Sequence, residues 1–108
     1  MRNANGKSQN MKQVSRFTRI LKEHKPELAG RYKVKSLGIF GSYLRGEQRA
    51  RSDLDVLVEF DDDTLSLLKF IEMERYLSEL LGVKVDLVEK SGLRPAIGRR
   101  ILEEVKPI

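Results

Sequence analysis

The segment Leu54–Phe60 constrains the fold of this chain more than any other feature of its sequence. Its even-numbered positions are all apolar, whereas Asp55 and Glu59 occupy odd-numbered positions. Because successive side chains of a strand point to opposite faces, this alternation predicts a β-strand with one face on a core and the other face polar. A single strand is not stable alone in water, so the chain must build a sheet and cover one of its faces.

Two further short apolar runs predict the other strands of this sheet. They cover residues 34–41, which end in a glycine, and residues 83–88. The polar segment 42–52 leaves room for one helical turn around Tyr43 to Arg45. The predicted sheet therefore has three strands.

Apolar residues at helical spacing predict three helices, over residues 10–28, 65–82 and 95–105. We expect Gly30 to close the first helix after a disturbance at Pro26, and Thr64 to cap the second, which ends at Gly82. The order α-β-β-α-β-α predicts the fold class α/β (α+β), as a small mixed β-sheet with flanking helices.

Length and composition indicate one domain and exclude several kinds of site. The 108 residues are expected to form a single domain over residues 11–108, preceded by a disordered tail over residues 1–10. The chain has no Cys and a single His, His24, which excludes a disulfide framework, a thiol nucleophile and a multi-histidine metal centre. It has no apolar run near the roughly 18 residues of a membrane span and no apolar N-terminal signal, so we expect a cytoplasmic protein.

Positive charge is concentrated in the N-terminal third of the chain. Residues 1–35 hold ten Lys and Arg and two acids, whereas residues 36–108 hold eleven basic and fourteen acidic residues. A basic segment is typical of a polyanion partner such as nucleic acid, and equally of a solvated helix face. Because the rest of the chain is mildly acidic, a domain that only coats nucleic acid is not favoured.

Three aspartates form the first half of a candidate catalytic site. Asp53 and Asp55 stand two residues apart at the start of a strand, so both carboxylates leave the same face, roughly 6.5–7 Å apart along the chain. Asp86 is out of phase with its apolar neighbours and faces the same side if the two strands are adjacent. Converging carboxylates repel unless a cation lies among them, and hard oxygen ligands select Mg²⁺ or Mn²⁺ over zinc. Two such ions about 3.5–4 Å apart serve phosphoryl chemistry.

Gly41 and Ser42 form the second half of the candidate site. A glycine lets the backbone come close to a ligand, and Ser42 offers a hydroxyl and an N–H at the start of a turn, which suits a phosphate. Arg45, Arg49 and Arg51 follow, either as cations for a triphosphate or as a solvated loop.

The order of these residues resembles a known family. The motifs that carry the resemblance are Gly41-Ser42, Arg45-Gly46, Asp53-Leu54-Asp55 and Val85-Asp86-Leu87. They resemble those of the DNA polymerase beta nucleotidyltransferase superfamily. Within it the chain is similar to the minimal nucleotidyltransferase (MNT) group, the antitoxins of HEPN–MNT toxin–antitoxin pairs, over about Lys35 to Ile108.

This resemblance implies a fold and an activity. The fold is a minimal polymerase-beta-like palm, the nucleotide donor is ATP and the cofactor is Mg²⁺, with two ions. The activity is the transfer of AMP to a tyrosine hydroxyl on a partner HEPN ribonuclease toxin, which silences the toxin.

The resemblance also implies roles for the motif residues. Gly41 and Ser42 would hold the triphosphate, and Asp53 and Asp55 would bind both metal ions. Asp86 would be the third carboxylate, as general base or as metal ligand on the acceptor side. Arg45 fills the usual basic position of the nucleotide-binding motif, without an assigned role.

We expect the acceptor surface to come from outside this domain. The chain has no room for an acceptor domain, so a partner protein or another copy of the chain should supply that surface in a hetero- or homo-oligomer.

Three other functions stay open at this point. The same fold could neutralise a HEPN ribonuclease by complex formation alone, transfer a nucleotide to a small molecule, or bind nucleic acid through its basic third. Only the transferase functions require Asp53 and Asp55.

Overall fold

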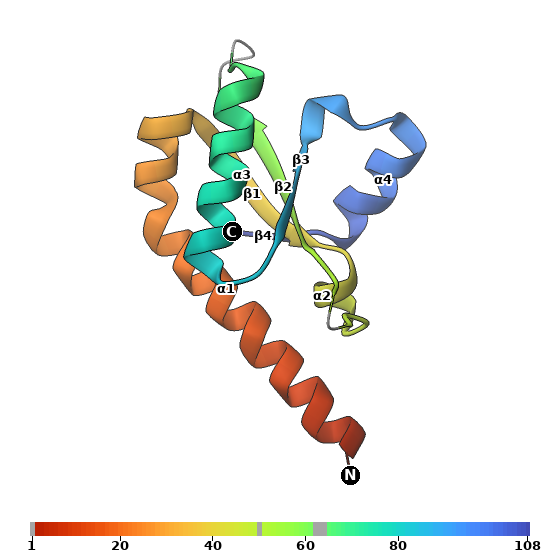
Figure 1. The fold of residues 1–108 in the computed structure, drawn as a ribbon. Coiled ribbons are helices and arrows are strands. Elements are labelled where there is room, and N and C mark those ends of the chain that lie inside the picture. Colours follow the sequence, from red (N-terminus) through yellow and green to blue (C-terminus); the bar gives the residue numbers. More distant parts are fainter. Residues whose placement is uncertain (1, 50, 62–64) are drawn as a thin grey trace.

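The computed structural model describes residues 2–49, 51–61 and 65–108, with side chains from residue 11 onward. A mixed sheet of four strands in the order β3-β2-β1-β4 forms the centre. Helices α1 and α3 lie together on one side of this sheet, and α4 lies on the other side (Figure 1). The predicted mixed sheet with flanking helices is therefore confirmed.

The strands follow the predicted segments closely. β1 (Val34–Phe40) runs antiparallel to β2 (Leu54–Phe60), and β2 runs parallel to β3 (Val85–Glu89). The fourth strand, β4 (Lys106–Pro107), pairs with β1 and was not predicted, because two residues are too few to show alternation.

The helices agree with prediction at their packed parts and differ at their ends. They are α1 (Arg2–Tyr32), α2 (Ser42–Arg45), α3 (Leu67–Leu81), a 3₁₀ turn η1 (Lys90–Gly92) and α4 (Pro95–Glu104). The short α2 is the helical turn expected there, and Gly82 ends α3 in a left-handed conformation as predicted. Thr64 lies outside the described residues, and the side chain that caps α3 is Ser66, which accepts a hydrogen bond from the Lys69 N–H.

Helix α1 is longer at both ends than the sequence predicted. It already begins at Arg2, where a disordered tail over residues 1–10 was expected. A helix that is nucleated by packing elsewhere propagates at little cost, and residues 2–10 hold no proline to stop it. At the other end both Pro26 and Gly30 lie inside the helix, and Lys33 follows it with a positive φ of 59°.

The core lies between the sheet and the pair α1 and α3. The even-numbered side chains of β2 point into it, as their alternation predicted. The fully buried residues contributed by the two helices are Phe17, Leu21, Leu28, Tyr32, Met73, Leu77 and Leu81. The odd-numbered side chains of β2 are thus left for the opposite face, where the candidate site lies.

Gly38 lets the C-terminal segment close against the sheet. A Cβ at this position would lie 2.4 Å from Val105 Cγ2 and 3.3 Å from the Lys106 carbonyl oxygen. The Ile108 N–H then donates to the Leu37 carbonyl at 2.9 Å. This close approach anchors the end of α4 beside the site. None of the helices that the structure describes has both the length and the apolar character needed to cross a membrane.

Candidate active site

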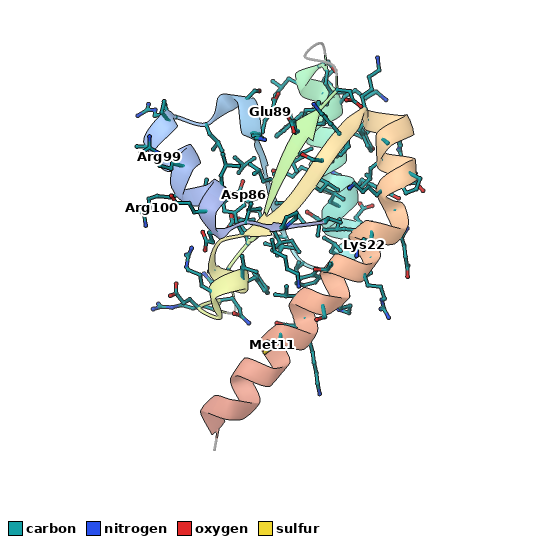
Figure 2. All side chains as sticks on the ribbon, turned by 180° about the vertical axis from the view of Figure 1, so that it is seen from behind. Met11, Lys22, Asp86, Glu89, Arg99 and Arg100 are labelled. Carbon is teal, nitrogen blue, oxygen red and sulfur yellow. The ribbon has the colours of Figure 1, made fainter. Side chains whose placement is uncertain are left out.

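Two carboxylates meet across the parallel pair of strands. Asp55 on β2 is the register partner of Asp86 on β3, on the face of the sheet away from the core. Asp53 immediately precedes β2 and shares the side of Asp55. Asp86 points to the side of the sheet on which α4 lies (Figure 2). The expectation that β3 lies beside β2 is confirmed, and this pairing brings Asp55 next to Asp86.

The proximity of these charges alters the acidity of Asp55. Its pKa is raised from 3.8 to about 6, mainly by desolvation and then by the negative charges of Asp86 and Asp53. A hydrogen bond with Asp86 adds to the effect, whereas Arg45 opposes it. The pair therefore holds a proton, or another cation, more firmly than an isolated aspartate does.

Asp53 is balanced by a cation that the sequence analysis did not single out. Lys84 Nζ lies 3.9 Å from Asp53 Oδ2, and the lysine side chain is 80% exposed. Lys84 stands two residues before Asp86 and therefore on the same face of the chain, although it precedes β3. That spacing was the available signal, but it becomes meaningful only once β3 is known to lie beside β2.

Gly41 is fitted to Asp55. It follows β1 with φ 83° and ψ −156°, a region that only glycine adopts readily. A Cβ placed on it would lie 1.9 Å from Asp55 Oδ2. From its position at a strand end this glycine was expected to admit a ligand, and in the structure it admits the Asp55 carboxylate.

Ser42 opens the short helix α2 directly after this glycine. Its side chain is half-buried, and its carbonyl accepts the Glu47 N–H at 2.8 Å, which closes the turn. Gly41 and Ser42 thus follow directly after Phe40, the register partner of Asp55, so their backbone N–H groups lie at the end of β1 beside Asp55. This arrangement suits an anion placed beside the carboxylates.

The guanidinium of Arg45 is held in place by two carboxylates, those of Glu47 and Glu104. Its Nη1 donates to Glu104 at 2.6 Å, and its Nε donates to Glu47 at 2.9 Å. These hydrogen bonds raise the pKa of Arg45. Glu104 belongs to α4, so the basic residue of the motif is tied to the C-terminal helix.

Other residues weighed in the sequence analysis lie outside the site. Tyr43 is buried, and its ring meets that of Phe17 edge-on with centroids 5.8 Å apart, so it packs in the core. Arg49 and Arg51 are exposed on the loop before β2. His24 Nδ1 is 2.9 Å from the Ile20 carbonyl oxygen within α1 and takes no part in the site.

The donor set agrees in chemistry with a divalent cation. Asp55 and Asp86 are neighbouring hard oxygen ligands whose mutual repulsion a cation would relieve. Asp53 is turned toward Lys84, and within the described ranges no three acidic or histidine side chains are already gathered around one point. Binding an ion through all three aspartates would require Asp53 to leave Lys84.

Comparison with known proteins agrees with this geometry. The sequence matches the nucleotidyltransferase domain family over residues 21–108, which include every residue of the site. The chain belongs to this family. A nucleotidyltransferase domain accordingly accounts for the mixed sheet, the Gly41-Ser42 turn and the aspartates.

Individual relatives show which members of the nucleotidyltransferase family this chain is similar to. The chain is 54% identical over 86 residues to the protein adenylyltransferase MntA of Thermococcus cleftensis, which covers 80% of this chain and 86% of that protein. A solved structure described as a "putative minimal nucleotidyltransferase" is 34% identical, with a TM-score of 0.70 over 92% of this chain and 95% of that one. A chain of a toxin–antitoxin crystal structure with AMP-PNP is 27% identical, with a TM-score of 0.62 over 83% of this chain and 67% of that one. The predicted minimal nucleotidyltransferase fold is thereby confirmed, and the chain is similar to protein adenylyltransferases.

Proposed function

We propose that this nucleotidyltransferase transfers AMP from ATP to a tyrosine hydroxyl of a partner HEPN-domain toxin and so acts as its antitoxin. The observation that carries the proposal is the Asp55–Asp86 pair beside the Gly41-Ser42 turn. One feature gathers negative charge for a cation, and the other presents N–H groups to phosphates. The similarity to MntA and to a chain of a toxin–antitoxin complex supports the choice of a protein acceptor. ATP is abundant in the cytoplasm, where we place the reaction.

The reaction is an in-line displacement at the α-phosphorus of ATP. The tyrosine oxygen forms a bond to this phosphorus while the bond to the bridging α–β oxygen breaks, and the electron pair leaves with pyrophosphate. The backbone N–H groups at Gly41 and Ser42 would hold the triphosphate and orient the leaving group. Asp86 is exposed on the edge strand β3, so it would face the acceptor and take the proton of the hydroxyl.

Asp53, Asp55 and Asp86 would hold the two Mg²⁺ ions. When bound, these ions neutralise phosphate charge and lower the pKa of the attacking hydroxyl. The strand pairing forms the cation site in advance, because it keeps Asp55 and Asp86 side by side despite their repulsion. Lys84 pairs with Asp53 in the free protein. When ATP binds, Lys84 would pair with the triphosphate instead and release Asp53 to the cations.

The experiment uses ATP labelled at the α-phosphorus, Mg²⁺ and a purified HEPN-domain protein from the same organism. We expect label on a tyrosine of that protein with the wild type and none with Asp53→Asn, while both bind the HEPN-domain protein equally. Arg19→Glu serves as a control, since this exposed residue of α1 belongs neither to the Gly41-Ser42 turn nor to the aspartates, and we expect it to leave the label unchanged. Binding without label in the wild type would instead favour neutralisation by complex formation, and label only on a small molecule would refute the protein acceptor.

A further inference from the structure

Helix α4 carries a groove on the outer side of the domain that the proposed reaction does not use. The groove has a volume of about 490 Å³ and lies between α4 and the turn η1. Its apolar lining comes from Leu93, Pro95 and Leu102, and Leu102 is 49% exposed. This volume falls within the roughly 300–1,000 Å³ of ordinary binding pockets. Apolar surface left open beside charged residues is typical of an interaction site.

The rim of this groove is strongly basic. Lys90, Arg94 and Arg99 line it, and Glu103 is the acid among the lining residues. Lys90 pairs with Glu59 at 3.7 Å, whereas the ion pairs of the described residues leave Arg94, Arg99 and the adjacent Arg100 without a carboxylate. Figure 2 shows Arg99 and Arg100 reaching outward from α4. Charge complementarity therefore predicts that the surface of a partner bound in the groove is negatively charged.

The groove is built into the same elements as the active site. The strand β3 carries Asp86 and leads through Glu89 directly into η1, which forms one wall. At its other end α4 provides Glu104, the carboxylate that holds Arg45 of the nucleotidyltransferase motif. A molecule seated in the groove thus lies on the side of the sheet where the acceptor hydroxyl must arrive.

We infer that this groove, the α4 groove, docks the acceptor protein through an amphipathic helix with an apolar ridge flanked by Asp or Glu side chains. The inference rests on the proposed function, which requires a protein acceptor. An apolar lining with open arginines fits a helix laid into a groove, and arginine is enriched among the residues that dominate protein interfaces. Nucleic acid fits less well, because neither η1 nor α4 offers an aromatic ring on which a base could stack.

Two substitutions test the α4 groove at exposed positions that do not support the fold. Leu102→Glu places a charge on the apolar lining, and Arg99→Glu reverses the rim. The matched controls are Leu68→Glu on α3, where the leucine is 80% exposed, and Arg19→Glu on α1. We expect Kd for the HEPN-domain protein to rise about tenfold or more in both groove variants and to stay within about twofold in both controls. Binding of AMP-PNP with Mg²⁺ should be unchanged in all four.

The outcomes separate docking from catalysis. Label transfer with unchanged Kd in both groove variants would overturn the docking inference and leave the proposed function intact. Weaker binding in the groove variants without label in the wild type would uphold docking and refute the proposed function. Three results would overturn the inference. Loss of binding in Leu68→Glu as well would show that the effect is not specific to the groove. A wild-type dimer that dissociates in Leu102→Glu would show that the groove binds a second copy of the chain, and loss of RNA binding alone in Arg99→Glu would show that it binds RNA.

Discussion

Replacing Gly41 with alanine should disable the site by moving one carboxylate. The new Cβ would lie 1.9 Å from Asp55 Oδ2, and a contact under 3.0 Å is not tolerated, so the oxygen must shift by about 1 Å. A displacement of about 1 Å in a catalytic arrangement costs roughly 100-fold in rate. The backbone strain at φ 83° and ψ −156° adds about 1–3 kcal/mol of destabilisation. We therefore expect a folded, less stable protein whose label transfer falls roughly 100-fold.

Gly82→Ala is the matched control for this prediction. Gly82 also has a positive φ, of 75°, but nothing lies within 4 Å of the added Cβ. It should lose about 1–2 kcal/mol of stability and retain its activity. Thermal unfolding by circular dichroism and the rate of label transfer at a temperature well below both Tm values give the two readouts. Wild-type transfer in Gly41→Ala, or an equal loss in Gly82→Ala, would refute the argument from the Asp55 contact.

Three further predictions concern charge and hydrogen bonding around the site. Asp55→Asn should raise the free energy of unfolding at pH 7.5 without Mg²⁺ by about 1 kcal/mol, after allowance for the partial exposure of the carboxyl, and so raise Tm; it should also abolish transfer. Because the folded pKa of Asp55 is raised to about 6, the wild type loses stability as pH rises from about 4 to about 6. The variant lacks this loss, so equal Tm differences at pH 3.5 and 7.5 would contradict the prediction. At limiting Mg²⁺, wild-type transfer should decline as pH falls, since a proton on Asp55 competes with the cation, and saturating Mg²⁺ should move this decline to lower pH; a pH–rate profile that does not respond to the Mg²⁺ concentration would count against this role. Ser78→Ala should lower the free energy of unfolding by about 1–2 kcal/mol, and with it Tm, because the Val85 N–H on the outer edge of β3 donates to Ser78 Oγ at 2.9 Å. Ser91→Ala at an exposed turn is the control and should leave Tm unchanged.

The centre of the fold and the aspartates were predictable because each depends on local periodicity. The alternation of β2 assigned its apolar side chains to the core and left Asp55 on the opposite face. Asp86 followed from the same rule once β3 was taken as the neighbour of β2. Gly41 and Ser42 were recognisable through their spacing from Asp53 and Asp55, because a glycine at a strand end alone marks only a turn.

Features that depend on distant contacts were not predictable in the same way. The tie from Arg45 to Glu104 joins residues far apart in sequence, and neither residue type reveals its partner. Lys84 became relevant only through the spatial position of Asp53. Strand β4 exists because Gly38 admits the segment after α4, which no pattern within that segment encodes. The extent of α1 reflects propagation from its packed turns rather than its own apolar spacing.

Nucleotidyl transfer leaves the α-phosphorus of ATP on the acceptor, so the position of the retained phosphorus identifies the reaction. Parallel reactions with the HEPN-domain protein and Mg²⁺ would contain ATP labelled at the α-phosphorus or at the γ-phosphorus. We expect only the α label to be retained on the acceptor tyrosine, in equal amount to the pyrophosphate released, and neither label to be retained with Asp53→Asn. Retention of the γ label would show phosphoryl rather than nucleotidyl transfer, and retention of neither label by the wild type would contradict catalysis by this site.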